Sequence, residues 1–289
     1  MTHPDYNSPL ALKAFLDDNG MAMQKKFGQN FLVNADARSK IIDHLDVSNG
    51  TTVWEVGPGL GCMTDELLRR GGTVTAFEID HGFARLVREF FADSAKAGAF
   101  SLVEGDVLKT WKKHAEANGT PERFFGNLPY NVAATIIADT INAGVRFEKA
   151  VVTIQKEVAQ RMTAKEGTEQ YSSFSVLCQW AYTIKNVVEL AGGNFWPVPN
   201  VASRAVLMTK REDFPRCENP TLFMRMIRQL FSSRRKTVRN NLLALAGAEK
   251  TDAALSQAGI SPSIRAEALS VDALLHLSDA LNAVLHEGA

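Results

Sequence analysis

The stretch TTVWEVGPGLGCMTDELLRRGG (residues 51–72) decides the class of fold. It begins with alternating β-forming residues, runs into a glycine cluster, and continues as a helical pattern that ends at two glycines. Alternation of apolar and polar residues indicates a strand, and glycines after a periodic segment are a usual helix C-terminus. The stretch therefore predicts a strand, a tight turn and a helix.

The same pattern repeats along the following residues. Further strands are predicted at 73–80, 100–109, 123–127 and 149–155, with helical segments between them, including one over 81–98. Strands that alternate with helices predict an α/β fold with a parallel, doubly wound sheet. After Lys156 the pattern changes, and a β-rich run that ends near Arg211 predicts an antiparallel hairpin at the sheet edge.

Composition divides the chain into three predicted parts. Residues 1–22 are expected to form an N-terminal extension, residues 23–212 the α/β domain, and residues 213–289 a small all-helical domain. The boundary lies in a polar stretch with two prolines. Helices are predicted in the last part over residues 221–231, 236–246 and 271–285, the last with Ser270 as N-cap.

Overall composition is that of an ordinary globular protein, with 45% hydrophobic and 22% charged residues and a formal net charge of zero. Three cysteines without a Cys-x-x-Cys and six scattered histidines predict neither a disulfide framework nor a metal site. We see no signal peptide and no apolar run near the roughly 18 residues of a membrane span, so we expect a cytoplasmic protein without a membrane partner.

The glycine cluster predicts a ligand site. Gly57, Gly59 and Gly61 have the spacing G-x-G-x-G, and Cys62 stands where the dinucleotide fingerprint has its last glycine. This departure weighs against NAD and favours S-adenosylmethionine (SAM), which has no pyrophosphate to cradle. The next strands end in acids. We expect Glu78 to hold two ribose hydroxyls and Asp106 to accept from the adenine amino group.

The tetrapeptide Asn127-Leu128-Pro129-Tyr130 follows another strand and would face the same ligand. An exocyclic amine is a poor nucleophile because its lone pair is delocalised into the ring. The Asn127 side-chain oxygen and the Leu128 carbonyl would accept hydrogen bonds from the two N–H groups of the amine and favour its reactive pyramidal form. Pro129 would hold the backbone, and Tyr130 would stack on a flipped base.

Several motifs in one order carry a resemblance over about residues 24–270: KKFGQNFL (25–32), the glycine cluster, the Asn127–Tyr130 tetrapeptide, Gln155–Val158, Phe195 with Pro197-x-Pro199, and FSSRRKTVRNNL (231–242). The chain resembles the small-subunit rRNA adenine dimethyltransferases. The resemblance implies a Rossmann-like class I SAM-dependent methyltransferase domain that makes N6,N6-dimethyladenosine at two adjacent adenines near the 3′ end of 16S rRNA.

The resemblance also implies roles for individual residues. Phe195 matches an aromatic that stacks on the target adenine, beside the catalytic tetrapeptide. The residues expected to bind SAM are Gln29, Asn30, Leu32, Glu55, Gly57, Gly59, Gly61, Glu78, Asp106 and Asn127. Departures from the family pattern are Asn200 and Ala202 after the prolines, Ser172 after Tyr171, and Ser232-Ser233 before the Arg-Arg-Lys run.

Basic residues gather in the tail. The stretch 216–239 holds seven basic residues and one acid, although the whole chain has no net charge. Such a cluster predicts contact with RNA phosphates. The candidate RNA-binding residues are Lys25, Lys26, Arg234, Arg235, Lys236 and Arg239.

Two other functions remain open from the sequence. One is a large-subunit (23S) rRNA adenine methyltransferase, against which the basic helical tail argues. The other is a ribosome-assembly or nucleic-acid-binding factor without essential catalysis, which loss of a cofactor or catalytic residue would favour. No such residue is lost here, and we expect a monomeric enzyme that acts on the small ribosomal subunit or its precursor.

Overall fold

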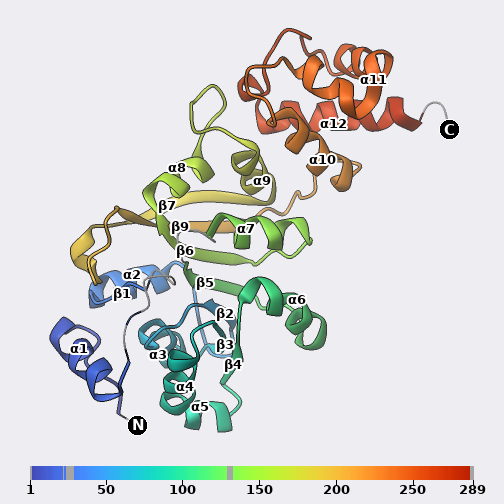
Figure 1. Ribbon diagram of the computed structural model, residues 1–289. Helices are drawn as coiled ribbons and strands as arrows, with labels where there is room; N and C mark the ends of the chain where they lie inside the picture. The colour runs from blue at the N-terminus through green and yellow to red at the C-terminus, as the bar shows by residue number, and fades with distance from the viewer. Residues whose placement is uncertain (1, 22, 24–28, 129–132, 287–289) are drawn as a thin grey trace. The chain divides into compact units, whose positions relative to one another are not determined.

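The computed structural model describes residues 2–21, 23, 29–128 and 133–286 (Figure 1). The chain folds into two compact units. The first contains residues 1–140, 145–159 and 185–210, and the second contains residues 141–144, 160–184 and 211–289. Within the described residues, no helix has both the length and the apolar character needed to cross a membrane.

A seven-stranded sheet forms the centre of the first unit, with strand order β4-β3-β2-β5-β6-β9-β7. The strands β2 to β6 are parallel, and β9 is antiparallel to β6. This confirms the predicted parallel sheet with an antiparallel addition at its edge. The bounds are β2 (Thr52–Val56), β3 (Thr73–Glu78), β4 (Phe100–Glu104), β5 (Arg123–Asn127), β6 (Lys149–Gln155), β7 (Tyr182–Leu190) and β9 (Ser203–Lys210).

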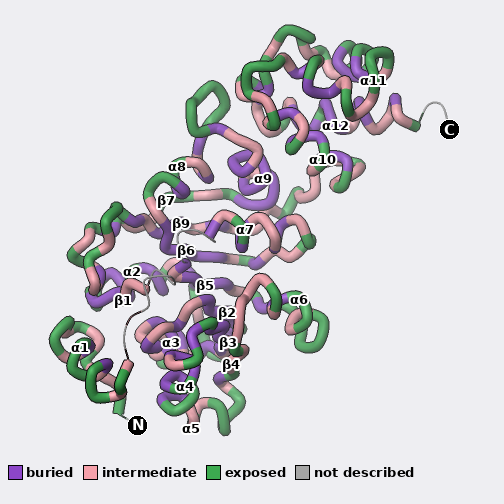
Figure 2. The backbone as a smooth tube through the Cα atoms, viewed as in Figure 1, coloured by how far each residue is buried: buried purple, intermediate pink, exposed green. Residues whose placement is uncertain are grey.

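Helices follow the strands as the alternation predicts, and buried residues lie along the strands (Figure 2). A two-stranded sheet also pairs β1 (Phe31–Leu32) with β8 (Phe195–Trp196), after the 3-10 turn η2 (Gly192–Asn194). The helices up to β7 are α1 (Pro9–Asp18), α2 (Ala35–Asp43), α3 (Cys62–Arg69), α4 (His81–Phe90), α5 (Ala92–Lys96), α6 (Val107–Asn118), α7 (Ala133–Asn142), α8 (Lys156–Thr163) and α9 (Ser173–Ala181).

The single helix predicted over 81–98 is wrong, because the structure has two helices there. The chain leaves the helical conformation at Phe91, where φ is −104° and ψ is 23°. The Phe91 ring is buried and packs against Phe100, with 5.2 Å between ring centroids. Tertiary packing of this ring accompanies the break, and such a contact is invisible to a local helical pattern.

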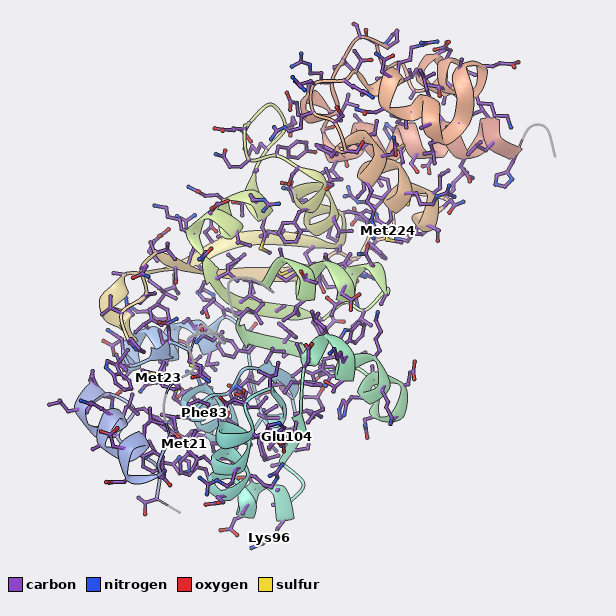
Figure 3. All side chains as sticks on the ribbon, viewed as in Figure 1. Met21, Met23, Phe83, Lys96, Glu104 and Met224 are labelled. Atoms are coloured by element: carbon purple, nitrogen blue, oxygen red, sulfur yellow. The ribbon has the colours of Figure 1, made fainter. Side chains whose placement is uncertain are left out.

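Residues 2–21, in the predicted N-terminal extension, pack against the first unit. Leu12 and Leu16 of α1 are buried. The Tyr6 hydroxyl donates to the carbonyl of Leu60 at 2.9 Å. Leu60 lies inside the glycine cluster. Met21 approaches Gly82 at the start of α4, near Phe83 (Figure 3).

The second unit is helical. Its remaining elements are α10 (Pro220–Leu230), α11 (Val238–Gln257), η3 (Ala266–Ala268) and α12 (Val271–His286). Two helical stretches of α11 meet at Gly247, whose φ is 74°, so the predicted end at residue 246 matches a break in the helix. Ser270 accepts from the Ala273 N–H at 3.1 Å, which confirms the predicted N-cap.

Helix α9 groups with the C-terminal helices although the sequence places it in the α/β domain. Trp180 donates from Nε1 to the Pro215 carbonyl at 2.5 Å, and its ring packs on Phe214 and Phe223 at centroid distances of 4.5 and 4.9 Å. The compact second unit therefore takes in residues 160–184. The domain boundary after residue 212 stays a prediction.

Candidate active site

The glycine cluster forms a tight turn between β2 and α3. Gly57, Gly59 and Gly61 have φ values of 75°, 56° and 83°, a region that side chains with a Cβ rarely adopt. A Cβ at Gly61 would come within 2.6 Å of the Phe91 ring, whereas a Cβ at Gly57 would meet only the Asn127 carbonyl, at 3.5 Å. The turn therefore presents bare backbone at the carboxyl end of the sheet.

Glu78 lies at the end of β3 and is 5% exposed. Its Oε2 accepts from the Gly59 N–H at 3.1 Å, and its Oε1 accepts from the Asp80 N–H at 2.9 Å. Burial raises the pKa of this carboxyl to about 7, against the opposing effect of these backbone donors. Each carboxylate oxygen keeps a second lone pair for a ligand hydroxyl.

Glu55, near the end of β2, is buried more deeply and accepts from the Thr64 hydroxyl at 2.7 Å. Burial, with a smaller contribution from the nearby Glu78 charge, raises its pKa to about 8 against the opposing effect of the Thr64 hydrogen bond. Asp106 is the N-cap of α6, and its Oδ1 accepts from the Leu108 N–H at 3.0 Å. In the part of the chain that the structure describes, the other Asp106 carboxylate oxygen has no hydrogen-bond partner.

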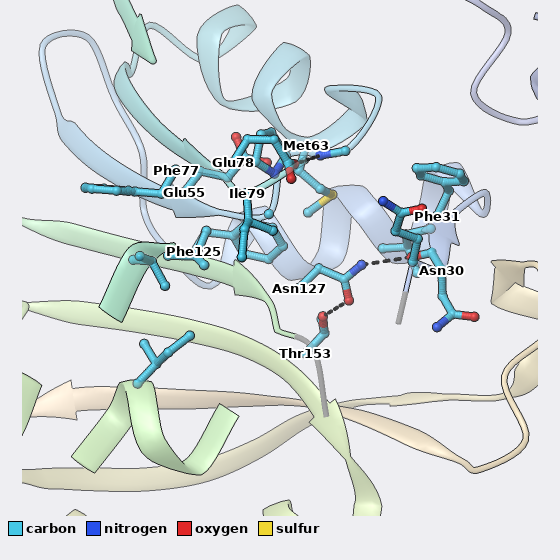
Figure 4. Close-up of a pocket in the computed structure, with 18 of the residues that line it drawn as sticks. Asn30, Phe31, Glu55, Met63, Phe77, Glu78, Ile79, Phe125, Asn127 and Thr153 are labelled. Carbon is cyan, nitrogen blue, oxygen red and sulfur yellow. Dashed lines mark hydrogen bonds between the residues drawn. The ribbon is translucent and has the colours of Figure 1, made fainter. Parts of the chain in front are cut away.

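The Asn127 carboxamide, at the end of β5, is held at both ends (Figure 4). Its Nδ2 donates to the Asn30 carbonyl at 2.9 Å, and its Oδ1 accepts from the Thr153 hydroxyl at 2.6 Å. The next residue, Leu128, is buried, and its N–H donates to the Thr153 carbonyl at 3.2 Å. The predicted catalytic residues Pro129 and Tyr130 lie outside the described residues.

The segment of Gln29, Asn30 and Leu32 forms another wall. Gln29 donates from Nε2 to Asp80 Oδ2 at 3.2 Å, which ties this segment to the N-terminus of α4. Phe195 is the register partner of Leu32, but it is 3% exposed and belongs to the hydrophobic core. Its ring does not line the cavity that these walls surround, and its predicted stacking role stays a prediction.

These groups surround a cavity of about 290 Å³. Its size is just below the roughly 300–1,000 Å³ usual for small-molecule pockets. Of the ten residues expected to bind a cofactor, all but Gly61 line it, so the structure brings together Gln29, Asn30, Leu32, Glu55, Gly57, Gly59, Glu78, Asp106 and Asn127.

The sequence reasoning missed the apolar walls and one polar residue. Phe31, Ile79, Val107 and Phe125 line the cavity, and so does Thr153. Ile79 and Val107 directly follow the two strand-end acids, so an apolar residue in that position was an available signal. Nothing in the local sequence marks Thr153. Apolar walls with a few acceptors are typical of a small-molecule site.

The candidate RNA-binding residues of the second unit fall into two groups. Arg234 pairs with Glu267 at 2.9 Å, and Arg239 makes two bonds to the Asp252 carboxylate at 2.6 and 2.8 Å. Arg235 and Lys236 are exposed and have no ion-pair partner among the described residues. Lys25 and Lys26 lie outside the residues that the structure describes.

Solved structures share this fold. A dimethyladenosine transferase from Plasmodium falciparum matches with a TM-score of 0.69 and 22% identity, over 84% of this chain and 94% of that chain. The 23S rRNA methyltransferase ErmE matches with a TM-score of 0.64 and 23% identity, over 87% of this chain and 99% of that chain. Both are methyltransferases, so the chain has a methyltransferase fold, as predicted.

Sequence comparison identifies the family. A protein of Treponema denticola named ribosomal RNA small subunit methyltransferase A is 46% identical over 283 residues, covering 96% of each chain. The protein of that name from Streptococcus pneumoniae is 36% identical over 93% of this chain and 95% of its own. The family model described as ribosomal RNA adenine dimethylase matches residues 20–283. The chain therefore belongs to the ribosomal RNA adenine dimethylase family.

Proposed function

We propose that this protein transfers methyl groups from SAM to N6 of two adjacent adenosines near the 3′ end of 16S rRNA, giving N6,N6-dimethyladenosine during ribosome biogenesis in the cytoplasm. The observation that carries the proposal is the Asn127 carboxamide, held at both ends in the wall of a cavity rich in acceptors. The names of the sequence relatives support the small-subunit target.

The hydrogen-bond acceptors and apolar walls of the cavity fit SAM. Glu78 has free lone pairs for two ribose hydroxyls, and the second oxygen of Asp106 can accept from an adenine amino group. Ile79 and Val107 offer apolar surface to a purine ring. The absence of a side chain at Gly57 leaves space between the turn and Asn127 for the amino-acid part of the ligand.

The bound cofactor would supply an electrophilic methyl group on its sulfonium. The chain contributes position and electrostatics. The Asn127 oxygen and the Leu128 carbonyl accept hydrogen bonds from the two N–H groups of the target amine. These bonds favour the pyramidal form of the amine, which exposes its lone pair to the methyl group. In this proposal Tyr130 stacks on the flipped adenine.

Exposed cations of the second unit would bind the RNA. Arg235 and Lys236 are free to contact phosphates, whereas Arg234 and Arg239 are already neutralised by acids. In this proposal the protein acts as a monomer.

Transfer of labelled methyl from SAM to small ribosomal subunits tests the proposal. Subunits that lack the 3′-end dimethyladenosines should gain two methyl groups on each of two adenines, and subunits that carry them should gain none. Asn127→Ala should abolish labelling. Asn118→Ala removes an exposed amide that bonds within α6, so it should label like the wild type.

Labelling of large subunits instead would move the assignment to a 23S target. Binding of small subunits without any labelling would reject catalysis on this substrate and favour an assembly factor.

A further inference from the structure

A buried hydroxyl lies among the apolar residues that fill the interior of strand β6. Thr153 lies on β6 with 2% of its surface exposed, after Val151 and Val152, which are fully buried. A valine would fill such a position without the cost of burying a polar group. Thr153 is also the register partner of Asn127 on the neighbouring strand β5.

Thr153 contacts the Asn127–Leu128 pair twice. Its hydroxyl donates to Asn127 Oδ1 at 2.6 Å (Figure 4). Its backbone carbonyl accepts from the Leu128 N–H at 3.2 Å. The carbonyl contact uses backbone atoms that any residue has. The hydroxyl contact depends on threonine or serine at this position.

The hydroxyl restricts the Asn127 carboxamide to one orientation. Asn127 Nδ2 faces the Asn30 carbonyl, so a flipped amide would place two acceptors against each other. The Thr153 hydroxyl holds the other end and limits smaller rotations about the side-chain bond. An amide oxygen has two lone pairs, so one remains for a second donor after the Thr153 contact.

We propose that Thr153 is a positioning residue for methyl transfer, which aims the second lone pair of the Asn127 oxygen at the amine of the target base. This inference rests on the proposed function. Thr153 acts through Asn127 and has no direct role in holding the ribose or the adenine of the cofactor, which we assign to Glu78 and Asp106.

The test compares Thr153→Val, which keeps the branched shape, with Thr153→Ser, which keeps the hydroxyl. Single-turnover methyl transfer to unmodified small subunits would be measured at saturating SAM, and SAM affinity by calorimetry. Thr153→Val should slow transfer about five- to tenfold, as expected for one lost hydrogen bond, with the SAM dissociation constant changed less than about twofold. Thr153→Ser should stay within about twofold of the wild-type rate.

A matched control is Thr140→Val, since Thr140 is also buried but bonds to carbonyls of its own helix α7. Its transfer rate should be unchanged. A wild-type rate in Thr153→Val would overturn the positioning role, as would equal slowing in the valine and serine variants. Failure of the wild type to label any subunit would reject the proposed function itself, which separates the two results.

Discussion

The cavity of the first unit and the basic surface of the second unit hold their polar groups in opposite ways. Glu55, Glu78 and Asn127 are largely covered, and each is bonded to a neighbouring backbone or side-chain group. Arg235 and Lys236 are exposed, and the structure shows no ion pair for either within its described part. Buried polar groups need partners because an unpaired one costs free energy, whereas exposed cations are satisfied by water.

This difference indicates two modes of recognition. Fixed acceptors in a cavity select a small ligand by geometry, so the loss of one acceptor should matter at any salt concentration. Exposed cations attract a polyanion by charge, so their contribution should depend on salt.

Glu78→Gln should weaken SAM binding most. The amide keeps the size of the side chain but offers one acceptor oxygen in place of two, while Gly59 and Asp80 still need acceptors. Loss of one hydrogen bond to a charged group costs about 1.5–3 kcal/mol, or roughly 10- to 100-fold in affinity, measured by calorimetry.

Glu104 provides the matched control for Glu78. It is the register partner of Glu78 on β4, but it is exposed and pairs with Arg88 at 2.8 Å. Glu104→Gln should leave SAM affinity within about twofold. Equal losses in the two variants would contradict selection by the cavity.

Glu55→Gln should remove a pH dependence of stability in the ligand-free protein. Burial raises the Glu55 pKa from 4.5 to about 8, so between these values the native state keeps a proton that the unfolded state releases. The unfolding free energy of the wild type should therefore fall with rising pH in this window, by up to about 1.4 kcal/mol per pH unit from this group. Above about pH 8 the Glu55 carboxyl is ionised in both states, so its contribution to the slope of unfolding free energy against pH should vanish.

Urea titrations of the wild type and Glu55→Gln at several pH values measure this difference. The glutamine cannot ionise, so the wild type should lose stability relative to it as pH rises. A constant difference across the window would show that burial does not perturb this carboxyl.

The pair Arg235→Ala and Lys236→Ala, made together, should weaken binding to small subunits by about tenfold at moderate salt. The slope of log affinity against log salt should flatten by about two, because two phosphate contacts are lost. Arg239→Ala should change the slope less, since Asp252 already neutralises that guanidinium. A slope change in Arg239→Ala as large as that of the double variant would mean that the Arg239–Asp252 ion pair breaks when RNA binds.

Tyr6→Phe should have the smallest effect. It removes the hydroxyl that donates to the Leu60 carbonyl behind the glycine turn. We expect a loss of about 1 kcal/mol in stability and a few-fold weaker SAM binding. Thermal unfolding with and without SAM would measure both, and an unchanged SAM-induced shift would restrict the role of Tyr6 to stability.

Local patterns predicted much of the fold and part of the site. The strand-turn-helix at 51–72 and the acids Glu78 and Asp106 were predicted in their observed places, because parallel strands bring their carboxyl ends to one edge. Thr153 was missed, because its link to Asn127 crosses 26 residues and depends on strand register. The ring of Phe195 lies in the core, and its predicted role at the target base stays a prediction.

The basic tail shows the same limit. Its four candidate residues are all basic and cannot be told apart in the sequence. In the structure, Arg234 and Arg239 form ion pairs with acids 33 and 13 residues further along the chain. Charge counting cannot separate paired from unpaired cations, since pairing depends on how the helices pack.

The α/β class, the glycine turn and the family could be predicted from the amino-acid sequence, because they depend on residue period, local backbone freedom and motif order. The folded structure was needed to establish which acceptors face the cavity, which arginines pair with acids, and that Thr153 and Asn30 hold the Asn127 carboxamide from two sides. Hydrogen bonds act over about 3 Å, and folding alone brings such distant residues that close.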